Sequence, residues 1–425
     1  MITLLIVADD FTGALDTGVQ LAGCGAPTRV VTDPEFSPAN AAGAEVLVID
    51  AETRHLPPSQ AGAIVEGIVR RAVEQKVPYI YKKTDSALRG NVGAELGALL
   101  AASGEKALPF LPAYPQIGRC TRGGVHYIEG RPVAESVFGI DPFEPVRHSD
   151  IAGLIGAQSG VPVHSLPADA PAPEGQGIYV YDASSLADLE RAGQTLAAAG
   201  RLHISAGCAG FGAVLPRLLG LGRAQQPPKP RLDPRLLVVC GSVNPITVAQ
   251  LDAAEEAGFA RLRLTPRQKL EPGYWNTPEG EADRARIEAL LQANPRVLLD
   301  SNDAGGNGPT ADYAAGLGCG LEEMRVRIAS SIGDLVADLL HSPAVGTLLM
   351  TGGDTLLQVM RCAGVRELEP LCELEKGVVL ARCTYRGCTR HVITKSGGFG
   401  QAALLTDLAA HLEAQAEGNR NRSER

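Results

Sequence analysis

The nine cysteines of this 425-residue sequence include no Cys-x-x-Cys pair, and their number is odd. A disulfide framework uses an even set of cysteines, and a zinc ribbon uses closely spaced pairs. Neither architecture therefore fits the sequence. We expect most of the nine residues to be buried free thiols.

The sequence also lacks an excess of basic residues. Its 39 Lys and Arg are outnumbered by 48 Asp and Glu, which gives a formal net charge of -9. A protein that binds nucleic acid needs a basic face or stripe, and the scattered Lys and Arg do not form one. Nucleic acid is therefore not an expected partner, and an anionic ligand would need a locally positive pocket.

No uncharged apolar run approaches the roughly 18 residues that a membrane-spanning helix requires. The apolar start, Met1 to Ala8, has no basic segment before it, and Asp9 and Asp10 interrupt it too early for a signal peptide. It is typical instead of a first strand. We expect no membrane partner and a cytoplasmic location.

Two common nucleotide-binding signatures are missing as well. The sequence has no Gly-x-x-x-x-Gly-Lys-Ser/Thr loop and no Gly-x-Gly-x-x-Gly fingerprint. The second absence argues against a dehydrogenase. A phosphate site in this chain must therefore use another design.

The composition is otherwise that of an ordinary folded protein, with 45% hydrophobic and 20% charged residues. Apolar runs typical of strands alternate with helical patterns, which favours parallel sheets covered by helices. The length is too great for one ordinary core. The predicted fold class is therefore α/β, with two α/β domains that each contain a mainly parallel sheet flanked by helices.

The clearest domain boundary is the proline cluster from Gln225 to Pro230, because such a segment favours an extended polyproline conformation. It predicts an N-terminal domain at residues 1–226, a Pro-rich linker at 227–234 and a C-terminal domain at 235–415. The polar tail at 416–425 is expected to fray.

Polar side chains follow three predicted strands of the N-terminal half. Asp9 and Asp10 follow the first strand, Arg54 follows a later one, and a crowded turn from Lys82 to Arg89 follows a third. Ligands bind at the carboxyl ends of the strands in open α/β sheets, so we expect these groups to converge on one crevice. Each residue alone is also compatible with an ordinary turn or a helix cap.

The turn from Lys82 to Arg89 combines cations, hydroxyls and a carboxylate. Adjacent strand residues point to opposite faces, so only one of Lys82 and Lys83 is expected to enter the crevice. Cations bind a carboxylate through charge-assisted hydrogen bonds, whereas aspartates accept hydrogen bonds from hydroxyls, so the mixture suits a polyhydroxy acid. The candidate binding residues of the turn are Lys83, Thr84, Asp85, Ser86 and Arg89.

Three further polar residues lie near a predicted hairpin. Residues 126–133 are typical of a hairpin with a Gly turn, and residues 116–124 are typical of a loop. Arg119, Arg122 and His126 could reach a ligand from there, or they could be solvated loop and edge residues. The sequence leaves both interpretations open.

Three glycine loops of the C-terminal half each lie between a predicted strand and a predicted helix. Glycine at such a turn lets backbone N–H groups approach phosphate oxygens. One such loop would only indicate a tight turn, but three at like positions predict a nucleotide site. The loops are Gly241-Ser242, Gly352-Gly353-Asp354 and Gly397-Gly398-Phe399-Gly400.

With both halves in view, the sequence resembles the four-carbon acid sugar kinase family from its first strand to its last helix. The resemblance implies an N-terminal domain that binds a sugar acid, a C-terminal domain that binds ATP, and an active site in the cleft between them. It also implies phosphorylation of the terminal hydroxyl of threonate, erythronate or their oxo forms. Five ordered motifs carry it, namely Ala8–Ala14, Lys83–Gly90, Gly241-Ser242, Thr351–Thr355 and Lys395–Gly400.

On matching positions, the resemblance assigns residues to the two ligands. Asp9, Asp10, Arg54 and residues 83–89 would hold the sugar acid, with Lys83 rather than Lys82 in the crevice. ATP would be held by Ser242, Gly352, Gly353, Asp354, Gly397, Gly398, Phe399 and Gly400. Mg²⁺ would bridge the phosphates, and the sequence does not identify its protein ligands.

The choice of substrate rests on a smaller segment. Residues 130–133, with Asp141-Pro142 and residues 145–150, look closer to the threonate and erythronate members than to the 3-oxo-tetronate members. We therefore expect a kinase for the C4 hydroxyl of D-threonate or D-erythronate, with a 3-oxo-tetronate 4-kinase as the alternative. A sugar-acid dehydrogenase and a non-catalytic sugar-acid-binding protein are alternatives of other classes. The oligomeric state is left open, a homo-oligomer included.

The residue types suggest different roles for these side chains in binding the sugar acid. The substrate carboxylate would be held by Lys83, Ser86 or Arg89, with Arg54 sharing it, and the aspartates Asp9, Asp10 and Asp85 would accept hydrogen bonds from its hydroxyls. Two carboxylates are candidates for the catalytic base. They are Asp354, by analogy with other sugar kinases, and Asp85, and the sequence does not choose between them.

Overall fold

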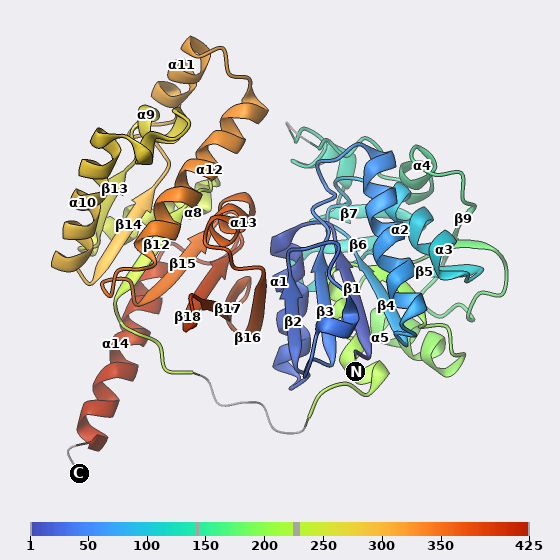
Figure 1. Cartoon of the computed structure of the whole chain (residues 1–425). Helices are drawn as coiled ribbons and strands as arrows, with labels where there is room; N and C mark the ends of the chain where they lie inside the picture. The colour runs from blue at the N-terminus through green and yellow to red at the C-terminus, as the bar shows by residue number, and fades with distance from the viewer. Residues whose placement is uncertain (1, 142–143, 224–229, 424–425) are drawn as a thin grey trace. The chain divides into compact units, whose positions relative to one another are not determined.

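The structure, a computed structural model, describes residues 2–141, 144–223 and 230–423. The chain divides into two compact units, Met1–Pro227 and Pro228–Arg425 (Figure 1). Part of the predicted linker at 227–234 and Pro142 of the substrate-preference segment lie outside the described residues. The predicted limits of the domains and linker therefore stay predictions.

The N-terminal unit is built on a parallel sheet. Its strands pair in the order β2-β3-β1-β4-β11-β5-β10-β9, and each of these pairs is parallel. The central strands are buried along their whole length because helices cover both faces, which explains their continuous apolar sequence. The strands are β1 (Leu4–Ala8), β2 (Thr28–Val31), β3 (Val46–Asp50), β4 (Tyr79–Lys83), β5 (Ala107–Leu111), β9 (Val163–Leu166), β10 (Gly177–Tyr181) and β11 (Ile204–Gly207).

Helices pack on both faces of this sheet (Figure 1). One face packs against α2, α3 and α4, whose apolar side chains share a core with alternate residues of the strands. The remaining helices pack among themselves and against the strands. Their bounds are α1 (Phe11–Gly23), α2 (Pro58–Glu74), α3 (Val92–Ser103), α4 (Ile151–Gly156), α5 (Leu186–Ala198), α6 (Ala209–Gly212) and α7 (Leu215–Leu219), with 3-10 turns η1 (Pro38–Asn40), η2 (Pro115–Ile117) and η3 (Val133–Glu135).

A small antiparallel sheet lies beside this architecture, formed by β6 (Arg119–Arg122), β7 (Val125–Ile128) and β8 (Arg131–Pro132). The hairpin predicted around the Gly turn is confirmed by β7 and β8. The loop predicted for residues 116–124 is wrong in part, because β6 pairs with β7 over its whole length.

The C-terminal unit repeats the parallel design and adds an antiparallel edge. Its strands pair in the order β13-β14-β12-β15-β18-β17-β16, parallel from β13 to β18 and antiparallel from β18 to β16. The sheet is therefore mainly parallel, as predicted. The strands are β12 (Leu236–Cys240), β13 (Ala260–Arg263), β14 (Arg296–Asp300), β15 (Thr347–Thr351), β16 (Glu367–Glu375), β17 (Val378–Tyr385) and β18 (Cys388–Lys395).

Helices α8 and α14 share one core with the strands of this sheet, and α12 packs against α13 and α9. The helices are α8 (Pro245–Glu256), α9 (Pro266–Leu270), α10 (Pro278–Ala293), α11 (Gly308–Gly316), α12 (Leu321–Leu339), α13 (Gly353–Cys362) and α14 (Leu404–Ser423), with a 3-10 turn η4 (Tyr274–Asn276). Helix α14 continues past residue 416, where fraying is predicted. The fraying of residues 416–425 stays a prediction, because a helical conformation does not exclude it. Residues 424–425 lie outside the described residues.

The cysteine prediction is half right. All nine cysteines lie in the described part of the chain and are thiols rather than disulfides. Only Cys208, Cys240 and Cys383 are buried, however, because the others lie on loops, at helix or strand ends, or on the less covered strands β6 and β16. Within the described residues, no helix combines the length and the apolar character needed to cross a bilayer.

Candidate functional site

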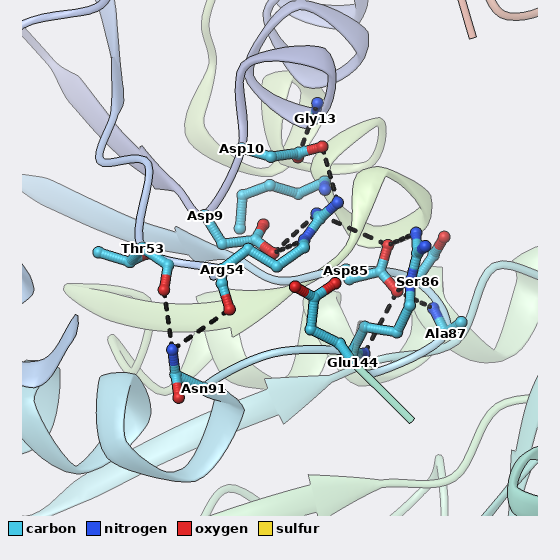
Figure 2. A network of polar contacts seen from close by, with 12 residues as sticks. Asp9, Asp10, Gly13, Thr53, Arg54, Asp85, Ser86, Ala87, Asn91 and Glu144 are labelled. Atoms are coloured by element: carbon cyan, nitrogen blue, oxygen red, sulfur yellow. Dashed lines mark hydrogen bonds and ion pairs between the residues drawn. The ribbon is translucent and has the colours of Figure 1, made fainter. Parts of the chain in front are cut away.

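Arg54 joins the carboxylates that follow two different strands of the N-terminal unit. Its Nε donates to Asp9 Oδ2 at 2.8 Å, and its Nη1 donates to Asp10 Oδ2 at 2.8 Å. Its Nη2 also lies 3.6 Å from Asp85 Oδ1. Figure 2 shows Arg54 between these three aspartates. The residues that follow β1, β3 and β4 therefore do converge, as their positions after parallel strands predict.

These carboxylates determine the charge state of Arg54. Burial opposes its charge, but Asp10, Asp9 and Asp85 outweigh burial and hold the pKa of the guanidinium well above its ordinary value. Arg54 is therefore held as a cation among three protein carboxylates.

Asp85 is held by a second arginine. Arg89 donates to both oxygens of the Asp85 carboxylate, from Nε at 3.0 Å and from Nη2 at 3.0 Å, and the backbone N–H of Ala87 adds a bond of 3.0 Å. Burial alone would raise the pKa of Asp85, but Arg89 and then Arg54 hold it well below its usual range. Asp85 is consequently an anion fixed in place, which makes it a weak proton acceptor.

The two lysines at the end of β4 have different environments. Lys82 Nζ lies 3.0 Å from Glu95 Oε2 of α3, and both side chains are buried. Lys83 is also buried, yet among the described residues no carboxylate or other acceptor forms a hydrogen bond with its ammonium. A Cβ added to Gly13 would lie 2.7 Å from Lys83 Nζ and 2.5 Å from Asp10 Oδ1, so the ammonium lies at the start of α1. Lys83 is therefore a buried cation available to a ligand.

Two buried oxygens of the same cluster also lack a partner within the described residues. They are Asp9 Oδ1 and Thr84 Oγ1. Burial would raise the pKa of Asp9, but Arg54, Lys82 and Lys83 together hold it below its ordinary value, so the carboxylate is ionised. A buried polar oxygen without a hydrogen bond costs free energy, which a ligand hydroxyl or a water can recover. The cluster is thus able to accept hydrogen bonds from a hydroxylated ligand and to donate one from Lys83.

Ser86 is held from the small antiparallel sheet. His126 Nε2 donates to the backbone oxygen of Ser86 at 3.0 Å, and Thr121 Oγ1 lies 3.2 Å from the other ring nitrogen. Arg119 Nη1 donates to Ser86 Oγ. The solvated interpretation is wrong for His126, which is fully buried, and it holds for the exposed Arg122. Arg119 lies between these cases, because its side chain is half-buried. The charged sequence of β6 hides this packing, and only its pairing with β7 reveals it.

The electrostatics of His126 follow from that burial. Desolvation lowers the pKa of the imidazole to about 4, and the nearby Arg119 acts in the same direction. His126 is therefore neutral at physiological pH and serves as a hydrogen-bonding support for the loop that carries Asp85 and Ser86.

The glycine loops of the C-terminal unit lie against one another. A Cβ added to Gly352, whose φ is +100°, would lie 3.2 Å from the carbonyl carbon of Gly241, and one added to Gly397 would lie 2.9 Å from Ser242 Oγ. Glycine suits both positions, because Gly352 has a positive φ and lies close to the Gly241 backbone, and Gly397 lies close to the Ser242 side chain. The three predicted loops therefore form one cradle at the ends of β12, β15 and β18.

Residues outside the predicted set hold this cradle in place. Lys395 Nζ donates to Thr247 Oγ1 at 3.1 Å and to the backbone oxygen of Gly397 at 3.2 Å, and Thr247 Oγ1 donates to the same oxygen at 2.9 Å. Gln250 Nε2 donates to the backbone oxygen of Phe399 at 3.0 Å. Desolvation lowers the pKa of Lys395 to about 8. Gly398, in contrast, has open space, since the nearest atom to an added Cβ is Asn244 Nδ2 at 3.9 Å.

Asp354 lies in the first turn of α13 and forms an ion pair with Arg325 of α12. The Asp354 side chain is 44% exposed, so solvent weakens this pair. The described residues include no group of three or more His, Cys, Asp or Glu arranged to hold a metal ion.

Family models cover both units of the chain. A model described as a sugar-binding N-terminal domain matches residues 4–215, and one described as a nucleotide-binding C-terminal domain matches residues 237–405. The side chains that gather around Arg54 are called the acceptor cluster below, and they lie within the first range, whereas the glycine cradle lies within the second. The acceptor cluster consists of Asp9, Asp10, Arg54, Lys83, Thr84, Asp85, Ser86, Arg89 and Arg119.

Several curated proteins are similar over nearly the whole chain. A D-threonate kinase of Salmonella typhimurium is 30% identical over 96% of this chain and 98% of its own, and one of Bordetella bronchiseptica is 31% identical over 95% and 96%. More distant relatives include a D-erythronate kinase of Heliobacterium modesticaldum, 27% identical over 87% of each chain. A 3-oxo-tetronate kinase of Methylobacterium radiotolerans is 28% identical over 93% of this chain and 96% of its own.

A solved structure from Salmonella typhimurium has the same fold. It superposes with a TM-score of 0.77, at 22% sequence identity, and the alignment covers 95% of this chain and 98% of that chain. At this identity the likeness supports the arrangement of the elements and nothing finer.

Proposed function

Because the chain belongs to the four-carbon acid sugar kinase family, we propose that it transfers the γ-phosphate of ATP to the C4 hydroxyl of a four-carbon sugar acid. D-threonate and D-erythronate are the proposed acceptors. The observation that carries this proposal is the end-to-end similarity to proteins named D-threonate kinase, which covers both units. A 3-oxo-tetronate substrate is the second candidate, since relatives of that name are only slightly less similar.

The acceptor would bind at the cluster around Asp9 and Lys83. Asp9 Oδ1 and Thr84 Oγ1 have no partner among the described residues, so each is suited to a substrate hydroxyl. Lys83 would donate to an oxygen of the acid, because its ammonium forms no bond within the described residues. Arg54 and Arg89 would act indirectly, by fixing the aspartates that surround the ligand.

The ATP phosphates would lie on the glycine cradle, where the absence of side chains at Gly352 and Gly397 leaves backbone N–H groups accessible. Lys395 and Thr247 would keep the backbone of this loop in position. When bound, Mg²⁺ neutralises phosphate charge. The remaining contribution of the protein is to align the C4 hydroxyl with the γ-phosphate and to exclude water.

Asp354 is the better of the two candidates for the catalytic base. Asp85 is held as an anion by Arg89 and Arg54, which weakens it as a proton acceptor, whereas Asp354 has one partly solvated arginine partner. A general base contributes roughly 100-fold or more to a rate. We therefore expect Asp354→Asn to lower kcat by on the order of 100-fold, measured as ADP release. Near-normal turnover would exclude Asp354 as the base.

The decisive experiment is a coupled assay of ADP release with ATP, Mg²⁺ and each of the four isomeric four-carbon aldonic acids. We expect turnover with one or two D isomers. Failure with all of them, and with their 3-oxo forms, would refute the kinase assignment. Separate titrations with NAD and with MgATP test the dehydrogenase and binding-protein alternatives, because a ligand that binds only the folded state raises the melting temperature.

A further inference from the structure

The arginines of the acceptor cluster differ in how their charges are balanced. Arg54 contacts Asp9 and Asp10, and Arg89 forms a two-bond pair with Asp85. Arg119 contacts the hydroxyl of Ser86, and within the described residues it has no carboxylate at ion-pair distance. Arg119 is therefore the guanidinium of this cluster whose charge is not neutralised by direct contact.

The surroundings of Arg119 leave its remaining donors available. Its guanidinium lies 5.1 Å from the centre of the Phe138 ring, and that of Arg89 lies 5.2 Å from the same centre. Stacking on an aromatic ring uses the flat face of a guanidinium and leaves the N–H groups in its plane for an acceptor. Only one of these donors, on Nη1, has an acceptor among the described residues. The other guanidinium nitrogens of Arg119 have no acceptor among the described residues, but in contrast to Asp9 Oδ1 they are not fully buried.

The electrostatic balance agrees with this geometry. Burial lowers the pKa of Arg119 and outweighs the opposing effect of Asp85, whereas the carboxylates around Arg54 outweigh burial and raise the pKa of that residue. A half-buried cation is more stable when an anion accompanies it. A carboxylate ligand would supply the counter-charge in direct contact, because a planar carboxylate fits the fork of a guanidinium through two parallel hydrogen bonds.

Building on the proposed function, we propose that Arg119 binds the carboxylate of the sugar acid and determines selection of an acid over a neutral polyol. Arg119 lies beside Ser86, whereas Lys83 lies beside Asp10 and Gly13 at the start of α1. The acid is thereby oriented with its carboxylate toward Arg119 and its hydroxyls toward Lys83 and Asp9. Ser86 and His126 position the loop on which this orientation depends.

The test compares Arg119→Gln and Arg119→Lys with the matched control Arg122→Gln. Arg122 is on the same strand but exposed, where it donates to Ser184 Oγ. Loss of a hydrogen bond to a charged group raises a dissociation constant roughly 10-fold to 150-fold. We expect Arg119→Gln to raise KM for the acid by this factor, to leave KM for ATP within threefold, and to leave the melting temperature near that of the wild type. Arg122→Gln should change none of these values.

The lysine variant separates carboxylate binding from a purely structural role. Arg119→Lys keeps a positive charge at this position but cannot reproduce the planar contact with Phe138 or the fork. If Arg119 binds the carboxylate, Arg119→Lys recovers part of the acid KM relative to Arg119→Gln. Equal values for the two variants, or an acid KM within threefold of the wild type for Arg119→Gln, would overturn the proposal.

Calorimetric binding of D-threonate, D-erythronate, threitol and erythritol distinguishes this inference from the proposed function. Acid binding that depends on Arg119 in a protein without phosphotransfer would refute the kinase assignment and support the inference. Phosphotransfer by the wild type, together with an acid affinity that is unchanged in Arg119→Gln, would support the kinase assignment and refute the inference. A wild type that binds neither acid, or binds the polyols as tightly as the acids, would overturn the inference.

Discussion

At the scale of single residues, the acceptor cluster is defined by which charges remain unpaired. The sequence identifies the residue types after β1, β3 and β4, because carboxylates and cations after apolar strands are visible as a pattern. The sequence does not reveal that Arg54 and Arg89 form ion pairs with aspartates, because such pairing depends on how the side chains are placed in the folded protein. The available cations, Lys83 and Arg119, become evident only once these pairs are known.

Lys83 provides the first test at this scale. Lys83→Ala removes a buried ammonium that would contact the acid, so we expect KM for the acid to rise roughly 10-fold to 150-fold while KM for ATP changes little. The measurement is steady-state kinetics with each substrate varied in turn. Lys106→Ala, at an exposed lysine, is the control and should resemble the wild type. A larger effect on ATP would mean that the ligands are assigned to the wrong units.

His126 provides a pH-dependent test of stability. The pKa of His126 is about 4 in the folded protein, below the ordinary value of 6.5. As the pH falls between these two values, the imidazole is therefore protonated in the unfolded chain but not in the folded protein. Stability is therefore lost on acidification from pH 6.5 to 4, by about 3 kcal/mol from this residue. Arg119 and Asp85 are the charged groups that act on this imidazole.

The measurement is denaturant unfolding at pH 7 and pH 4, for the wild type and for His126→Asn. The variant cannot titrate at this position, so it should lose less stability over the same range, although other carboxylates still contribute to both proteins. An equal loss in the two proteins would contradict the assigned pKa.

At the scale of elements, the prediction succeeds for buried parallel strands and fails for the charged strands β6 and β16. The apolar runs of β1, β12 and β15 are recognisable because both faces are covered. The strand β6, with the sequence Arg-Cys-Thr-Arg, and the acidic edge strand β16 have no apolar run, and pairing with a neighbour stabilises them. Strand β4 similarly extends through two lysines, so the predicted polar turn begins later than expected.

The glycine cradle is testable as an element. Gly398 has room for a methyl group within the protein, so Gly398→Ala should leave the melting temperature unchanged. If phosphates lie on this loop, the added Cβ meets the ligand instead, and KM for ATP should rise by about 10-fold or more. Gly316→Ala, at another uncrowded glycine in α11, is the control. A normal KM for ATP in Gly398→Ala would exclude the loop from the nucleotide site.

At the scale of the whole molecule, the division into two α/β units is the most predictable feature. Each unit has its own core, and the proline cluster falls between them. What the sequence cannot supply at this scale is the choice among four-carbon acids, because that depends on a few contacts at the acceptor cluster. The similarity to kinases with different named substrates illustrates the same limit.

Hydrogen exchange can assign each ligand to its unit. The acid alone should slow exchange of backbone amides in residues 9–13 and 84–90, and MgATP alone should slow it in residues 241–247 and 396–400, because bound ligands suppress local opening. The experiment compares the free protein with each complex by mass spectrometry. Protection of the opposite segments would reverse the assignment of the domains.

The convergence of three strand ends on Arg54 has a consequence for how the protein reaches its native state. Segments around residues 9, 54, 85 and 119 must all be in place before the acceptor cluster exists, and helices form much faster than such distant segments meet. During refolding, recovery of sugar-acid affinity should therefore lag behind recovery of helical content. Ligand affinity thus reports on completed folding of the N-terminal unit, which spectroscopic helicity alone does not.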